Sequence, residues 1–263
     1  MLNKVLKYDL KWVYKVLIAF YIIALVFSVF TRILFSIENS LIFNIFGQIC
    51  SGVTISFIFS ILINNIMRCW ARFVRNIYGD ESYLTHTLPI KKKTIFISKF
   101  LTSIITMFTS VLIILLVLFI AYYSKENLEI LKNSLNVLAS IYNSTVLKLL
   151  LVIFVVFFLE MLFVVQVGYT GILIGHKSNN NRMVKSIVYG FICYIVTQGL
   201  TLLIVFIVGL FNKDIMNLFI TNNIVNIDVV KLIMFIGIVI YTIYLYIYYK
   251  VDLMLFNKGI DVE

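Results

Sequence analysis

The chain has 263 residues, of which 62% are hydrophobic and only 13% are charged, and its mean hydropathy is +1.04. Soluble domains usually carry about 25% charged residues, so this composition excludes an ordinary soluble protein and indicates an integral membrane protein. The net charge of +10 does not indicate nucleic-acid binding, because the lysines and arginines lie beside the apolar runs. There they set the membrane topology and meet anionic lipid headgroups.

Six apolar runs are long enough to cross a bilayer as helices, for which about 20 residues suffice. They lie at 16–35, 41–67, 95–123, 146–174, 186–211 and 229–249. Little apolar material remains outside them for a separate soluble core. The sequence therefore predicts an all-α integral membrane protein with six transmembrane helices, forming a single domain over residues 1–263.

Basic residues are distributed unequally between the connections. They precede the first run and fill the second and fourth connections, whereas residues 36–40, 124–145 and 212–228 are poor in lysine and arginine or balance them with acids. The positive-inside rule therefore predicts cytoplasmic termini and an outer loop at 124–145. Within that loop four leucines repeat at helical spacing and predict a short helix: Leu128, Leu131, Leu135 and Leu138.

Residues 1–15 have an amphipathic pattern of their own. At 100° per residue, one stripe holds Lys4, Lys7, Lys11 and Lys15, and the other holds Leu2, Val5, Leu6, Leu10 and Val13. Asp9 interrupts the apolar stripe. The pattern predicts an interfacial helix that lies flat on the cytoplasmic side. The alternative interpretation is that the four lysines only set topology.

The second connection, residues 68–94, holds an unusual segment. Arg68, Arg72 and Arg75 repeat at helical spacing after the second run, with apolar residues on the opposite face, so the helix is expected to continue out of the bilayer. The stretch YGDESYLTHTLPIKKK (78–93) then contains the chain's one proline. Its acidic start and basic end suit a short helix ended by Pro89. Several of its apolar residues call for burial against a partner, whereas the alternative is a solvated loop whose lysines set topology.

No catalytic constellation emerges from the sequence. His86 and His176 lie in separate loops, and no cluster of His, Cys, Asp and Glu has the spacing of a metal site. The stretch GILIGHKS at 171–178 lacks the spacing and the preceding strand of a phosphate-binding loop. The sequence therefore predicts no catalytic residue, metal or cofactor in this chain, which argues against a membrane-embedded enzyme.

Glu160 is the single acid well inside a predicted span. A charge at that depth is costly unless it is protonated or faces the protein interior or a cavity. Two alternatives follow. Glu160 makes a polar interhelical contact with Gln166, Gln198 or another subunit, or it lines a translocation path.

The stretch GDESYLTHTLP (79–89), with Lys91, Lys92 and then Ser98-Lys99 opening the next span, resembles a known signature. It is similar to the Gly-Asp-Glu-x-Tyr-Leu-x-x-x-Leu-Pro pattern of ABC-2 type transporter permeases from low-GC Gram-positive bacteria. The resemblance extends to the six spans, the interfacial helix and the cytoplasmic termini. It implies a permease of the bacterial plasma membrane whose connection between spans two and three contains a cytoplasmic coupling helix.

In such permeases the coupling helix docks onto a separate ABC ATP-binding subunit, which carries the ATP and Mg. The resemblance assigns this docking to eight residues: Arg75, Asp80, Glu81, Tyr83, Leu84, Leu88, Pro89 and Lys91. Six spans alone make a poor conduit for a large cargo, so a homodimer is expected. The apolar spans suit an amphipathic or hydrophobic cargo, and permeases of peptide exporters, such as those for phenol-soluble modulins, are similar in size and style.

Two other functions stay open. A secondary transporter would show inverted repeats with broken helices at mid-membrane, but only the fifth run is interrupted, by Gly190 and Gly199. A membrane anchor or sensor for an ATPase would share the coupling segment and lack a passage, so measured flux would distinguish it from an exporter.

Overall fold

The computed structural model describes residues 1–37, 41–87, 89–178, 180–212, 215–216 and 227–258. Its helices are α1 (Leu2–Ser36), α2 (Leu41–Ile77), α3 (Ser82–Thr87), α4 (Lys92–Tyr122), α5 (Lys125–Ile141), α6 (Val146–Gly175), α7 (Arg182–Phe211) and α9 (Ile227–Asn257). The predicted all-α class is confirmed.

Six of these helices are long and apolar enough to cross a membrane in the described part of the chain: α1, α2, α4, α6, α7 and α9. The protein is therefore a multi-pass membrane protein. Its helices extend past the predicted runs. The 35 residues of α1 include the segment expected to be a separate interfacial helix. At about 1.5 Å per residue α1 is about 52 Å long, so it exceeds the hydrocarbon core of about 30 Å.

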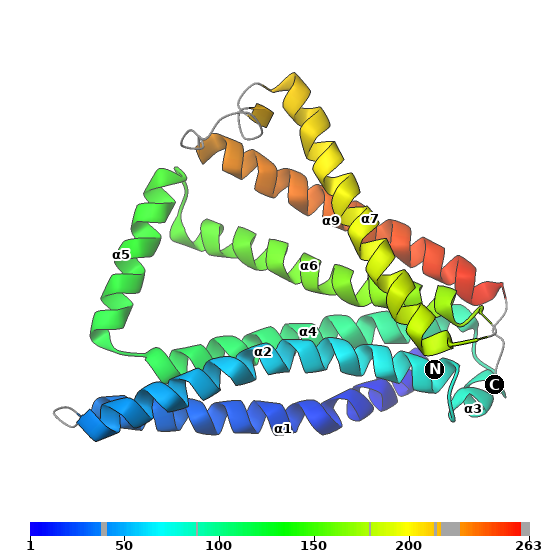
Figure 1. Ribbon diagram of the computed structural model, residues 1–263, viewed down its shortest axis with the longest axis horizontal. Coiled ribbons are helices and arrows are strands. Elements are labelled where there is room, and N and C mark those ends of the chain that lie inside the picture. The colour runs from blue at the N-terminus through cyan, green and yellow to red at the C-terminus, as the bar shows by residue number, and fades with distance from the viewer. Residues whose placement is uncertain (38–40, 88, 179, 213–214, 217–226, 259–263) are drawn as a thin grey trace. The chain divides into compact units, whose positions relative to one another are not determined.

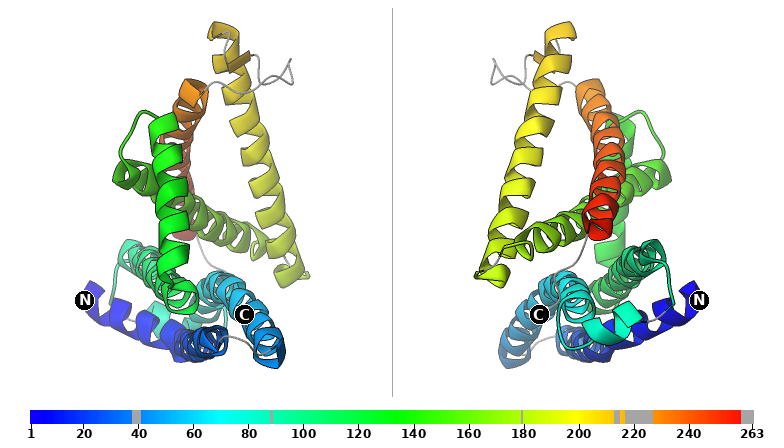
Figure 2. Two further views of the ribbon diagram at one scale, coloured as in Figure 1. Left: turned by 90° about the vertical axis from the view of Figure 1, so that its left-hand side faces the viewer. Right: turned by 90° about the vertical axis from the view of Figure 1, so that its right-hand side faces the viewer.

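The contacts divide the chain into two compact units, Met1–Lys132 and Asn133–Glu263. In the first unit α1 packs along both α2 and α4, and α3 packs against α2 (Figure 1). The end views in Figure 2 show α1, α2 and α4 as neighbouring rods. In the second unit α6 packs against α7 and α9. The helices thus form two groups. That the whole chain is a single domain stays a prediction.

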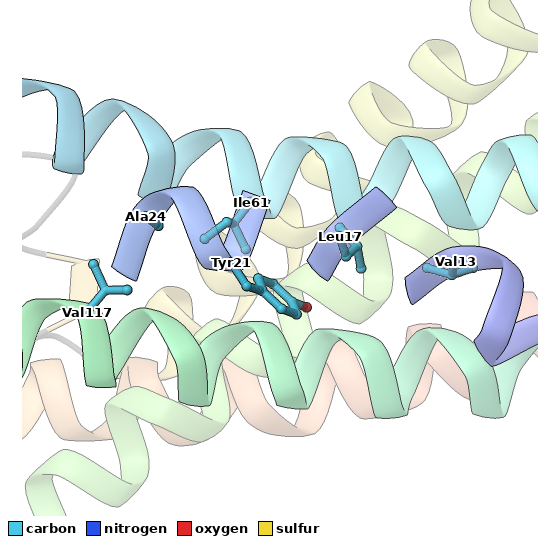
Figure 3. Close-up of a cluster of buried hydrophobic side chains, with 6 residues drawn as sticks. All are labelled: Val13, Leu17, Tyr21, Ala24, Ile61 and Val117. Atoms are coloured by element: carbon cyan, nitrogen blue, oxygen red, sulfur yellow. The ribbon is translucent and has the colours of Figure 1, made fainter. Parts of the chain in front are cut away.

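The core of the first unit follows one stripe of α1. Val13, Leu17, Tyr21 and Ala24 recur at helical spacing, and Ile61 of α2 and Val117 of α4 join them (Figure 3). The Tyr21 hydroxyl lies 2.7 Å from Ser110 Oγ of α4, which also accepts a 2.7 Å hydrogen bond from Asn65 Nδ2 of α2. Polar contacts thus connect the three helices inside an apolar core.

The second unit depends on small residues where α6 meets α7. A Cβ atom added to Gly171 would lie 2.6 Å from the Cα of Gly190, and one added to Gly175 would lie 2.4 Å from the backbone nitrogen of Ser186. The stretch that resembled a phosphate loop is therefore a helix-packing surface with the spacing Gly-x-x-x-Gly. Phe163 precedes these glycines on α6 and lies in a buried cluster with Tyr244 and Ile240 of α9.

The loop at 124–145 contains α5, as the leucine spacing predicted. Ala139 is the one buried residue of this helix, and Leu128, Leu131 and Leu138 are exposed. The helix itself is confirmed, while its predicted position on the outer side stays a prediction.

Candidate functional site

The segment between α2 and α4 contains a short helix, as the sequence predicted, while its role as a coupling helix stays a prediction. Helix α2 continues to Ile77, past the arginine repeat, and α3 begins at Ser82. Gly79 lies in the turn between them, where an added Cβ would be 3.1 Å from the Cα of Arg75 and 3.2 Å from its carbonyl oxygen. Little room exists for a side chain in this turn, and α3 follows it, packed against the end of α2.

A group of charged side chains is buried beneath this segment. The Asp9 side chain of α1 is 1% exposed, and its Oδ1 accepts hydrogen bonds from Arg72 Nε of α2 at 2.8 Å and Lys99 Nζ of α4 at 2.6 Å. Its Oδ2 accepts a 2.8 Å hydrogen bond from Ser98 Oγ. The Asp9 side chain therefore connects all three spanning helices of the first unit.

Glu81 extends this group to α3. Its Oε2 accepts a 2.5 Å hydrogen bond from Arg72 Nη1, and its Oε1 lies 3.3 Å from Arg75 Nε. Asn76 of α2 donates a hydrogen bond to Thr85 Oγ1 at 2.8 Å and a longer one to Glu81 Oε2 at 3.4 Å. Glu81 and Thr85 thus fasten α3 to the end of α2. We call Asp9, Arg72, Glu81, Ser98 and Lys99 the Asp9 network.

The charges of the five network residues balance. Asp9 and Glu81 carry two negative charges, Arg72 and Lys99 carry two positive charges, and the exposed Arg75 adds a further positive charge beside Glu81. Burying such groups costs free energy, which good geometry and additional hydrogen bonds offset. Removing one member of a buried pair leaves its partner uncompensated, at a cost of about 3–5 kcal/mol. The network therefore fixes the relative positions of α1, α2, α3 and α4.

The structure separates the predicted docking residues into two groups. Tyr83 is 74% exposed and Leu84 is 66% exposed. Asp80, Pro89, Lys91 and Arg75 are exposed as well. Glu81, in contrast, turns inward to Arg72, so its contacts are intramolecular. Leu88 lies outside the described residues.

Sequence patterns are less informative about the partners of Asp9 and the burial of Arg72. Asp9 interrupts the apolar stripe of residues 1–15, and the structure buries it on that stripe beside two cations. The arginine repeat predicts that Arg72 lies on the polar face of the α2 extension, whereas the structure buries it. Its guanidinium lies 5.6 Å from the ring centre of Trp12, and that of Arg68 lies 5.0 Å from the same ring. An acid within an apolar stripe was the available signal.

The N-terminal segment keeps its predicted division of faces. Lys4, Lys7, Lys11 and Lys15 are exposed, and the apolar stripe is buried or partly buried. The prediction that this segment lies flat in the membrane interface stays a prediction.

Glu160 lies partly buried on α6 and makes no hydrogen bond or ion pair within the described part of the chain. The two glutamines named as its partners have other contacts. Gln166 donates to Asp252, and Gln198 Nε2 donates to the Tyr241 hydroxyl at 3.3 Å. The remaining alternatives for Glu160 are another subunit and a translocation path.

The described residues contain no group of three or more His, Cys, Asp and Glu side chains that could hold a metal ion. The Asp9 network and α3 together form a fixed connection between a partly exposed short helix and three spans.

No protein-family model, no curated protein and no solved structure matches this chain.

Proposed function

We propose that this protein is the transmembrane subunit of an ATP-driven exporter, a permease of the ABC-2 type in the bacterial plasma membrane. The observation that carries the proposal is the two-sided character of α3. One side of the helix presents Tyr83 and Leu84 outward, while Glu81 and Thr85 fasten the other side to α2.

Large apolar side chains gathered at an exposed site indicate a surface that a partner covers. On α3 they lie next to the exposed charges of Asp80 and Arg75. We infer that a separate ATP-binding subunit, which holds the ATP and Mg, covers this surface. The resemblance of residues 79–89 to the coupling segment of ABC-2 permeases supports this choice of partner.

Force applied to α3 would reach the spans along defined contacts. It would pass to α2 through Arg72 and Asn76, and to α1 and α4 through the bonds of Asp9 to Arg72, Lys99 and Ser98. Because the contacts of Asp9 and Thr85 are buried and the Arg72–Glu81 contact is partly buried, α3 is expected to move together with the three helices instead of bending alone.

We propose an amphipathic peptide as the cargo, with two copies of the chain forming the passage. The spanning helices present mostly apolar side chains on their exposed faces. Glu160 is half-buried without a hydrogen bond or ion pair in the described part of the protein, which suits a position beside a passage or a second subunit.

The test is purification of the tagged chain from its native membrane in mild detergent, with mass spectrometry of what stays bound. We expect a subunit with ATP-binding motifs in about equal amount. Leu84→Asp should weaken this association by about 2 kcal/mol, roughly 30-fold in affinity, because a charge would enter an apolar contact. ATP turnover by the purified complex should fall in parallel.

Met183→Asp is the matched control, because Met183 is also an apolar residue with 63% exposure and lies near the start of α7. It should leave the association unchanged. The proposal is wrong if Leu84→Asp inserts into the membrane and keeps both the bound subunit and its ATP turnover. Repeated recovery of the chain alone would favour a secondary transporter.

A further inference from the structure

A second wholly buried carboxylate lies between α6 and α9. Asp252 of α9 has no exposed surface, and Thr170 Oγ1 of α6 donates a 2.6 Å hydrogen bond to its Oδ1. Gln166 Nε2 of α6 donates to its Oδ2. Gln166 and Thr170 are one helical turn apart, so both reach the same carboxyl group from one face of α6.

Asp252 has no cationic partner among the described residues, in contrast to Asp9 with Arg72 and Lys99. Neither Lys148 nor Glu160, the charged residues of α6, forms a hydrogen bond or ion pair with it in the described part of the chain. Cys193 of α7 and Tyr248 of α9 lie within electrostatic reach, and Tyr169 of α6 is titratable as well; all three are ordinarily neutral at pH 7. A buried charge that is left unpaired is expensive, so the site favours an uncharged carboxyl group.

The Gln166 side chain contacts Asp252 through its amide nitrogen alone. Its amide oxygen, Oε1, is buried and has no hydrogen-bond partner among the described residues. The N–H group that faces Asp252 partly offsets the cost of a negative charge there, but it brings no compensating cation, so burial remains the dominant effect and favours the uncharged carboxyl group.

The hydrogen-bond geometry accommodates a proton without rearrangement. The Thr170 hydroxyl lies 3.2 Å from the main-chain carbonyl oxygen of Gln166, which gives the hydroxyl a second acceptor besides Asp252. With a proton on Oδ1, the Asp252 O–H donates to Thr170 Oγ1, and the Thr170 hydroxyl donates to that carbonyl. Gln166 Nε2 continues to donate to Oδ2. When the proton leaves to water, the Thr170 hydroxyl turns back to Oδ1.

We propose that Asp252, Gln166 and Thr170 form a proton-binding site within the α6–α9 pair. The Asp252 carboxyl group binds the proton, and Thr170 changes from donor to acceptor as it does so. The site lies wholly within the second unit and requires no ATP-binding subunit. Its test and the test of the exporter function therefore succeed or fail separately.

The test is infrared spectroscopy of the full chain in detergent near neutral pH. We expect a carboxylic-acid C=O band that shifts on labelling the aspartates with carbon-13 and disappears in Asp252→Asn. Glu160→Gln is the matched control and should retain the band. The labelled wild-type protein alone decides whether any aspartate is protonated, so a poorly folding variant does not obscure the answer.

Stability gives a second readout, because asparagine has the shape and charge of a protonated aspartate. Asp252→Asn should change the melting temperature by less than about 2 °C. Absence of an aspartic-acid band would overturn the proposal. So would stabilisation of the wild type, but not of Asp252→Asn, by sodium or potassium chloride at constant ionic strength, because the site would then bind a metal cation.

Discussion

Asp9 and Asp252, the wholly buried aspartates of the described part of the chain, have opposite surroundings. Asp9 meets Arg72 and Lys99, whereas the described partners of Asp252 are an amide and a hydroxyl group. Because their neighbours differ, replacing each aspartate by asparagine is expected to have a different effect on stability. A charge is needed at position 9 because two cations are buried with it.

Asp9→Asn is therefore expected to destabilise the fold by about 3–5 kcal/mol, since Arg72 and Lys99 lose their shared counter-charge. For a chain of this size that corresponds to a melting temperature lower by about 10 °C. Thermal unfolding of the purified protein measures the effect. Asp80→Asn, at an exposed position in the turn before α3, should leave the melting temperature unchanged. Equal stability of the two variants would show that the Asp9 network contributes little.

Residue patterns indicated the face of a helix but not its neighbour. The period of α1 placed Asp9 on the buried stripe, yet its cations are 63 and 90 residues away in the sequence. Asp252 fell outside the predicted span altogether. A single sequence holds no signal for such pairings, because they depend on how three helices rotate against one another.

At the scale of elements, the sequence predicted most of what the structure contains. Apolar runs predicted six spans, the arginine repeat predicted the extension of α2, and leucine spacing predicted α5. Helix ends were less predictable, since α1 continues without a break from the amphipathic segment into the span. The close contact of α6 with α7 was missed, because small residues become informative only once the facing helix is known.

The contact between α6 and α7 can be tested by replacing each of two glycines, one inside the contact and one outside it, by alanine. Gly171→Ala should lower stability by about 1–3 kcal/mol, because its Cβ would overlap the backbone of Gly190 and force the helices apart. Gly199→Ala is the control, since nothing lies within 4 Å of a Cβ at that position of α7. It should be neutral or stabilise the helix by up to about 1 kcal/mol. Similar melting temperatures for both variants would contradict the close packing.

At the scale of the whole molecule, the division at Lys132 predicts independent folding stability for the first unit. A protease site introduced after Lys132 lies in the exposed part of α5. Cleavage there should leave the unfolding temperature of the first unit within about 2 °C of the intact value. Both tryptophans, Trp12 and Trp70, belong to this unit, so tryptophan fluorescence reports on it alone.

The same site introduced after Asp80 is the contrasting cut, because it separates α3 and α4 from α2 within the unit and interrupts the chain beside Glu81. Cleavage at this position should lower the unfolding temperature measured by tryptophan fluorescence. If cleavage after Lys132 has an equal effect, the two units do not fold independently.

The position of Asp9 near the start of the chain also has a consequence for biogenesis. The ribosome releases Asp9 before either cation, and Lys99 follows 90 residues later. A nascent chain that has inserted only α1 and α2 therefore holds a carboxylate whose second cation has not been made. Until the start of α4 has left the ribosome, Arg72 alone can compensate Asp9, so the α1–α2 pair is expected to be less stable at that stage of synthesis than in the complete protein.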